Sequence, residues 1–228
     1  MNPTPAPFDD TRPGTLLLVG SQQPLADSVR ERLQRDGHHV IAVQGGDDAA
    51  LQAALSAAPL IDALVTLTPT ARANLAFDEI DDATFEAAVE SQLLAVVRTA
   101  QAVLPRLREG GRIVHVGSRG HQGAWGGVHQ MAASAGLAAM TRSMALELQP
   151  EGHCVNLVAS EFSHERQDTP RNREAVTHAV SMLAAPRCGI TGQCMVIDGL
   201  ASMRMSEARR PPMAASPVQP VPPTLPIN

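Results

Sequence analysis

The sequence predicts an α/β protein with one parallel sheet of about six strands and helices on both faces. Short continuous apolar runs alternate along the chain with longer segments whose apolar residues recur every three or four positions. In the stretch 111–147, a β-branched run ends on Gly117 and Ser118, and a glycine-rich loop then leads into a helix of small residues. Ser118 therefore stands at the carboxyl end of a buried strand, where open α/β sheets place their ligands.

The first third of the chain supplies three strands and two helices. The predicted strands are 15–20, 40–43 and 62–67, and the predicted helices are 25–36 and 49–58. Gly37 ends the first helix. Only 17 residues lie between Gln44 and Asp62. They hold one helix with its loops and leave no room for a further strand and crossover.

The rest of the chain continues the alternation. It predicts a long helix 82–107, a strand 113–116, a helix 131–148, a strand 155–159, a polar loop 163–172, a helix 173–183 and a last strand 190–200. Seven of the 18 prolines lie close to the end of the chain. We therefore expect a flexible start at 1–13, one domain at 14–203 and a disordered proline-rich tail at 204–228.

Composition restricts the partners and the compartment. The net charge of −5 argues against a nucleic-acid or anionic-membrane partner. No apolar run reaches the roughly 18 residues of a membrane helix, and the N-terminus lacks the pattern of a signal peptide. Three cysteines without a CxxC pair fit buried thiols in a reducing compartment. The sequence therefore predicts a cytoplasmic protein, and its Arg-only, Ala-rich usage favours a bacterial source.

Three segments carry a resemblance to a known family. RIVHVGS, MAASAGLAAMTRSMALEL and the closing ITGQCMVIDGL resemble the short-chain dehydrogenase/reductase (SDR) family. The resemblance implies a Rossmann-like fold, here with one βα unit missing, and a catalytic serine followed by a Tyr-x-x-x-Lys helix. Met131 and Ala135 stand at the Tyr and Lys positions in one register, and Gln130 and Ser134 in the other. The chain has no tyrosine, and its 18 basic residues are all arginine.

The resemblance also locates the cofactor site. The family holds the dinucleotide pyrophosphate on a TGxxxGxG turn, because glycines admit the phosphates and the helix N-terminus donates N–H groups. Gly20 retains the first glycine, whereas Pro24 and Ala26 replace the other two. Gln44 stands where the family places the acid that holds the ribose. We therefore expect no cofactor, with Gly20 as a retained remnant; NAD(P) belongs to an alternative hypothesis.

Ser118 is the candidate catalytic residue. A serine without a supporting base is a poor nucleophile, which favours a remnant of the family pattern. His115, His121 and His129 lie near it in the sequence. A hydrolytic triad of Ser118, His121 or His129, and Glu161 is an alternative, although GSRG is not the GxSxG elbow. The same histidines lack a convincing metal-ligand spacing.

The leading functional hypothesis is a non-catalytic subunit. Helices 82–107 and 131–148 correspond to the pair through which SDR subunits usually dimerise. The resemblance thus implies a pseudoenzyme that scaffolds or stabilises a homo-oligomer or an active SDR paralogue. One alternative is an NAD(P)-dependent oxidoreductase with a reorganised site that uses Ser118 and a nearby histidine. Another is a small-molecule binding or regulatory protein that uses the vacated crevice.

Overall fold

The structure is a computed structural model that describes residues 14–20, 24–69, 75–124, 126–160 and 169–199. These residues form a sheet of six parallel strands in the order β2-β1-β3-β4-β5-β6. The strands are β1 (Thr15–Gly20), β2 (His39–Val43), β3 (Ile61–Leu67), β4 (Leu107–Ser118), β5 (Cys154–Ser160) and β6 (Cys194–Ile197). The predicted fold class is confirmed, and the sheet ends at β2 where doubly wound folds carry one strand more.

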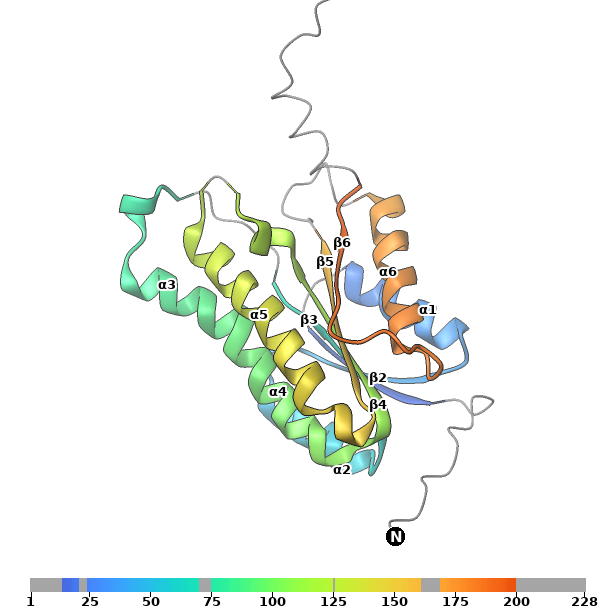
Figure 1. The fold of residues 1–228 in the computed structure, drawn as a ribbon. Helices are drawn as coiled ribbons and strands as arrows, with labels where there is room; N and C mark the ends of the chain where they lie inside the picture. The colour runs from blue at the N-terminus through green and yellow to red at the C-terminus, as the bar shows by residue number, and fades with distance from the viewer. Residues whose placement is uncertain (1–13, 21–23, 70–74, 125, 161–168, 200–228) are drawn as a thin grey trace, which may run out of the picture.

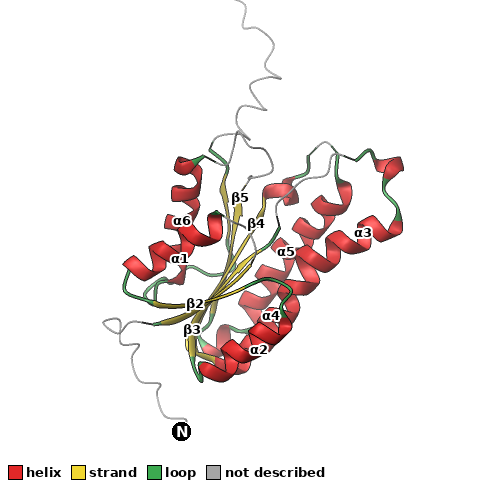
Figure 2. Cartoon of the chain, turned by 180° about the vertical axis from the view of Figure 1, so that it is seen from behind, coloured by secondary structure: helices red, strands yellow, loops and turns green. Residues whose placement is uncertain are grey.

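The helices form a layer on each face of the sheet. Helices α1 (Leu25–Arg35) and α6 (Pro170–Ala184) lie on one side. Helices α2 (Asp48–Ala57), α4 (Ala95–Val103) and α5 (Val128–Glu147) cover the other side, and α3 (Asp82–Val89) leads into α4 (Figures 1 and 2). Because both faces are covered, the central strands are buried on both sides and read as continuous apolar runs. None of the helices described is long and apolar enough to cross a membrane.

The long helix differs from the prediction of one continuous helix over 82–107. A π-helical turn, Glu90–Leu94, separates α3 from α4, and a 3-10 turn, Leu104–Arg106, ends the segment. Pro105 has no N–H to donate to the helical ladder, so the helix stops there and Leu107 belongs to β4.

Further boundaries differ, and strand β4 runs over Leu107–Ser118 instead of the predicted 113–116. Helix α5 starts at Val128, three residues earlier than predicted, and only 194–197 of the closing segment is strand. Helix α6 begins at Pro170, because the Thr169 side chain accepts a hydrogen bond from the N–H of Asn172, at 3.2 Å. The end of the predicted polar loop is therefore helical. Residues 163–168 of that loop, the predicted flexible start at 1–13 and the predicted tail at 204–228 lie outside the described residues.

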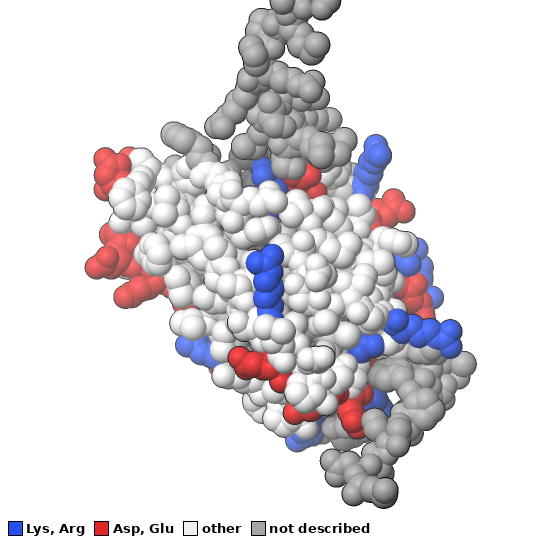
Figure 3. Space-filling view, viewed as in Figure 1, with Lys and Arg blue, Asp and Glu red and all other residues white. Residues whose placement is uncertain are grey.

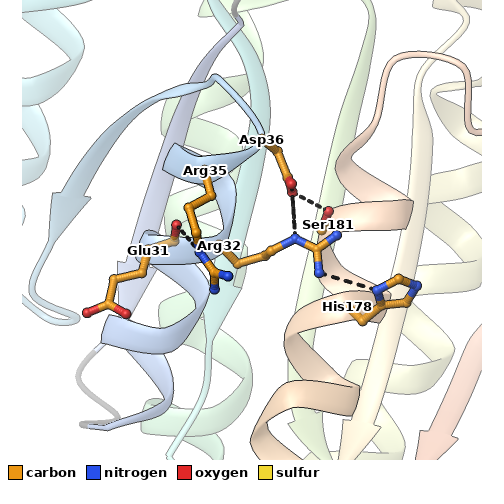
Figure 4. Close-up of polar contacts among 6 residues, drawn as sticks. All are labelled: Glu31, Arg32, Arg35, Asp36, His178 and Ser181. Atoms are coloured by element: carbon orange, nitrogen blue, oxygen red, sulfur yellow. Dashed lines mark hydrogen bonds and ion pairs between the residues drawn. The ribbon is translucent and has the colours of Figure 1, made fainter.

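A polar network joins the two helices of one layer (Figure 4). Arg32 Nε on α1 donates to both carboxylate oxygens of Asp36, at 3.0 and 2.9 Å, and Ser181 Oγ on α6 donates to the same carboxylate at 2.6 Å. Arg32 Nη1 lies 3.3 Å from His178 Nδ1. A guanidinium can only donate, so His178 Nδ1 accepts and the imidazole proton lies on Nε2. These directional contacts help to fix the orientation of α1 relative to α6, in addition to the apolar packing between the two helices.

Candidate functional site

The crevice of this fold lies where the strand order reverses. Strand β1 pairs with β2 on one side and with β3 on the other, so the connections after β1 and β3 lead in opposite directions. Open α/β sheets bind ligands at such a switch point. Here a cavity of about 300 Å³ opens between the carboxyl ends of β1 and β3, the start of α2 and the helix α4. We call it the switch-point cavity.

The lining of the switch-point cavity combines apolar walls with polar side chains. Its described lining residues are Val19, Gly20, Gly45, Gly46, Asp48, Thr66, Leu67, Thr68, Pro69, Glu90, Ser91, Ala95, Val96, Arg98 and Thr99. A second cavity of about 180 Å³ lies on the other side of β1, between β2 and α1. Gly20 lines both cavities, so the end of β1 separates them.

Gly20 has a structural reason to be glycine. Its φ of +156° lies in a region that side chains with a Cβ rarely adopt. A Cβ at this position would lie 2.5 Å from the Cβ of Leu67 and 2.6 Å from its carbonyl oxygen. The close packing of β1 on β3 therefore requires a glycine whether or not a phosphate approaches.

The Gly20→Ala variant is expected to lose about 2 kcal/mol of unfolding free energy, the usual cost of forcing an extra carbon into a packed site. Chemical denaturation without any added nucleotide measures this loss. Gly189→Ala is the matched control, because nothing lies within 4 Å of the added Cβ and no positive φ applies there. Equal stability of the two variants would contradict the packing role of Gly20.

The N-terminus of α1 does not fit a pyrophosphate. Pro24 occupies the N-cap position and has no N–H to offer. Ala26 is 7% exposed, so its methyl group packs in the core. Asp27 lies in the first turn, where its carboxylate already uses the positive end of the helix dipole and pairs with Arg30 at 2.8 Å. A bound diphosphate would meet a carboxylate where it needs donors.

Ser118 has a local partner. Its Oγ accepts a hydrogen bond from the N–H of Gly120 at 3.0 Å and caps the 3-10 turn Arg119–Gln122. No imidazole of the described residues bonds to this oxygen. The arrangement orders the turn after β4 and supplies no base for the hydroxyl.

The structure decides which residues of α5 lie beside that turn. A Cβ on Gly120 would lie 2.8 Å from Met131 Sδ and 3.1 Å from Ser134 Oγ, so both side chains lie against the turn. Ser134 is 3% exposed, whereas Ala135 faces solvent. Of the two possible lysine positions, Ser134 is therefore the one that faces the end of β4.

Among the described residues none of the three imidazoles bonds to the Ser118 hydroxyl, although the backbone of Ser118 interacts with the His121 imidazole and acts to raise its pKa. His115 is fully buried, and its Nδ1 lies 2.8 Å from Thr66 Oγ1; burial lowers its pKa to about 4. His121 Nε2 lies 3.6 Å from Cys194 Sγ, and burial is the main cause that lowers its pKa. His129 is 2% exposed. Glu161, the third member of the alternative triad, lies outside the described residues, and within them no three metal-binding side chains gather.

Sequence reasoning missed a buried ion pair at the same edge of the sheet. Arg119 Nε lies 3.8 Å from Asp198 Oδ2, and each side chain is 8% exposed. The pair connects the end of β4 to the end of β6. The retained Asp198-Gly199 of the closing motif was the available signal, but nothing in the sequence indicated that Arg119 is its partner.

The fold and the position of the crevice define a Rossmann-like, doubly wound α/β protein. Residues 14–170 match the family model described as enoyl-(acyl carrier protein) reductase. The chain belongs to the short-chain dehydrogenase/reductase family.

The relatives are reductases and dehydrogenases. The chain is 32% identical over 161 residues to a 3-oxoacyl-[acyl-carrier-protein] reductase of Vibrio harveyi, covering 61% of this chain and 66% of that protein. It is 31% identical over 160 residues to a (2S)-[(R)-hydroxy(phenyl)methyl]succinyl-CoA dehydrogenase subunit of Thauera aromatica, covering 61% and 62%. The chain spans 54% to 66% of the length of the curated relatives that it matches.

Solved structures share the fold at low sequence identity. The 3-ketoacyl-(acyl-carrier-protein) reductase from Brucella melitensis, complexed with NADH, aligns with a TM-score of 0.71 and 19% identity. The alignment covers 82% of this chain and 98% of that one. At this identity the likeness shows the fold alone.

Proposed function

We propose that this protein is a non-catalytic SDR subunit that scaffolds or stabilises an SDR assembly, made of its own copies or including a catalytic paralogue. The observation that carries the proposal is the absence of every tyrosine and lysine from the chain. Carbonyl reduction in this family uses a Tyr hydroxyl as the general acid, with its pKa lowered by a Lys ammonium. Arginine does not replace that lysine, because its planar fork is not a point charge on a flexible stem.

The charge of the crevice supports the loss of cofactor binding. Among the described residues that line the two cavities, the acids are Asp27, Asp48 and Glu90, and the bases are Arg30 and Arg98. Each arginine is ion-paired with an acid of its own cavity. The described lining therefore carries one more acid than base, which repels a diphosphate.

An apolar stripe on α5 supports the assembly role. Its exposed apolar residues recur at helical spacing at Val128, Ala132, Ala135 and Ala139, and Leu146 follows one turn beyond the exposed Arg142. Leu146 is 75% exposed, and Phe85 and Leu94 on the adjoining segment are each 39% exposed. Figure 3 shows a broad face with few charged side chains over α5, and α5 contains only Arg142 and Glu147 as charged residues. The small alanine side chains of the stripe let a second helix approach α5 closely.

Assembly is tested by placing a charge in the centre of this stripe. Ala135→Arg is expected to shift the protein from oligomer to monomer, because an unpaired guanidinium cannot be buried between two helices without a large desolvation cost. Light scattering coupled to size exclusion reports the mass. Ala53→Arg on α2 is the matched control, since Ala53 is also an exposed helical alanine. A monomeric parent protein that also captures no SDR paralogue from its native host would overturn the proposal.

An NAD(P)-dependent oxidoreductase is the second candidate. The names of the relatives favour it, and one neighbouring structure holds NADH. This candidate requires NADH or NADPH to raise the melting temperature, and it requires turnover that is lost in Ser118→Ala. The proposed non-catalytic subunit requires neither a rise in melting temperature with NADH or NADPH nor any turnover.

A further inference from the structure

The three cysteines of the chain are divided between the two faces of the sheet. All three are free and half-buried. Cys188, in the connection between α6 and β6, packs against the apolar cluster of α1 and α6. Cys154, the first residue of β5, faces the same side, because the next residue, Val155, points into the cluster of α2, α4 and α5. Cys194 packs against the cluster that contains Leu137 of α5 and therefore lies on the opposite face.

Cys154 and Cys188 are in direct contact. Cys154 Sγ lies 3.7 Å from the carbonyl oxygen of Cys188 and donates a weak hydrogen bond to it, although the two residues are 34 positions apart in the chain. A disulfide requires two Cα atoms about 4.4–6.8 Å apart and side chains that point towards each other. Because one thiol already touches the backbone of the other cysteine on the same face, rotation about the two Cα–Cβ bonds brings the sulfurs together.

The connection that carries Cys188 is bonded to the sheet on both sides of this residue. Before it, the buried guanidinium of Arg112 on β4 donates to the carbonyl of Pro186. After it, Asn156 Nδ2 on β5 donates to the carbonyl of Ile190 at 2.7 Å. These bonds hold Cys188 beside the start of β5 in the reduced protein, so little further ordering is needed to join the two thiols.

We propose that Cys154 and Cys188 form a reversible internal disulfide by exchange with a small disulfide such as glutathione disulfide. One protein thiolate attacks a sulfur of the donor and releases one glutathione thiolate, and the second protein thiolate then attacks the mixed disulfide and releases the other. Two protein thiols are thereby oxidised, and the donor is reduced to two glutathione thiols, which take up the two protons. Cys194 stays free, because neither of the other cysteines lies on its face of the sheet.

The bridge would change the stability of the folded protein. It would join the start of β5 to the connection between α6 and β6, and it would close a loop between two residues 34 positions apart. Closing such a loop restricts the unfolded chain, so the oxidised protein is expected to melt about 5–10 °C above the reduced protein. The proposal does not depend on the proposed assembly role, because the thiol pair lies on the face of the sheet opposite α5.

Counting thiols tests which cysteines are joined. The full chain is equilibrated in glutathione buffers of rising disulfide content, its free thiols are blocked with N-ethylmaleimide, and the intact mass reports how many were blocked. The parent protein is expected to keep one of its three thiols. Cys194→Ser is expected to keep none, whereas Cys154→Ser and Cys188→Ser should each keep both remaining thiols.

Thermal denaturation measures the effect of the bridge. The rise in melting temperature is expected in the oxidised parent and in oxidised Cys194→Ser, which is the matched control, and dithiothreitol should reverse it. The same treatment should leave the melting temperature of Cys188→Ser unchanged, because that variant cannot form the bridge. Comparing each variant with its own reduced form removes any effect of the substitution itself.

Several results would overturn the proposal. One is a parent protein that keeps all three thiols when glutathione disulfide is in large excess. Another is the loss of two thiols in Cys154→Ser or in Cys188→Ser, because the bridge would then involve Cys194. A stable glutathione adduct without an internal bridge, or a bridge between two chains on a non-reducing gel, would likewise contradict the pairing. None of these results bears on the assembly role, which the mass of the Ala135→Arg variant tests separately.

Discussion

Replacing Arg119 by methionine is expected to lower the free energy of unfolding by about 3 kcal/mol, the usual result of removing one partner of a buried ion pair. The methionine keeps most of the apolar stem of the side chain, so the change is chiefly one of charge. It leaves the Asp198 carboxylate buried without this guanidinium. Urea denaturation at neutral pH measures the loss, with the slope against urea reporting whether the folded state has changed.

The control is an exposed pair. Arg98 and Glu90 are 61% and 49% exposed, so Arg98→Met is expected to lose about 0–1 kcal/mol. The double variant Arg119→Met/Asp198→Asn is expected to recover part of the loss, because the buried carboxylate that lost this guanidinium is then replaced by a neutral amide. If Arg119→Met were no less stable than Arg98→Met, the ion pair would have no structural role.

Acidification from pH 6.5 to pH 4 is expected to cost the protein about 3 kcal/mol of stability through His115 alone. In the folded state burial lowers the pKa of this imidazole from 6.5 to about 4. Between these values the unfolded chain binds a proton that the folded chain does not, so stability is complete above pH 6.5 and is lost as the pH falls towards 4. Each pH unit in this window corresponds to about 1.4 kcal/mol.

A His115→Gln variant isolates this contribution. Glutamine can still bond to Thr66 Oγ1 but does not titrate, so its stability should fall less steeply over the same window. His121 and His153 also have lowered pKa values, mainly through burial, and they act in the same direction in both proteins. His39→Gln, at an exposed position of β2, is the control and should retain the full pH dependence. If the unfolding free energies of the parent and of His115→Gln fell equally with decreasing pH, His115 would not be the source of this pH dependence.

Most of the fold follows from local patterns. The apolar run 15–20 and the periodic segment after it were enough to place β1 and α1 within one residue. The 17-residue connection before Asp62 is too short for a further strand and crossover, and comparison with the layout of the family that the sequence resembles then predicted the missing outer strand. One boundary that sequence reasoning misplaced, the early start of α6, depends on a single hydrogen bond, from the N–H of Asn172 to the Thr169 side chain.

Much less of the candidate site could be predicted from local sequence patterns. Sequence alone retained Gly20 and Ser118 as remnants of a catalytic site. The structure instead gives each residue a structural role. Gly20 packs against Leu67, and Ser118 Oγ accepts a hydrogen bond from the N–H of Gly120. Likewise, His121 lies near Ser118 in the sequence, but its Nε2 lies beside Cys194 on another strand. Adjacency along a chain says little about which atoms meet.

The amino-acid sequence by itself determined the doubly wound sheet, its strand count and the absence of a Tyr–Lys pair, because periodicity and composition are properties of the chain. Only the tertiary structure decided that Ser134 rather than Ala135 faces the end of β4 and that Arg119 meets Asp198. The reason is that side-chain direction and hydrogen-bond partners depend on how distant segments pack. A one-residue change of register on a helix rotates a side chain from the protein interior to water.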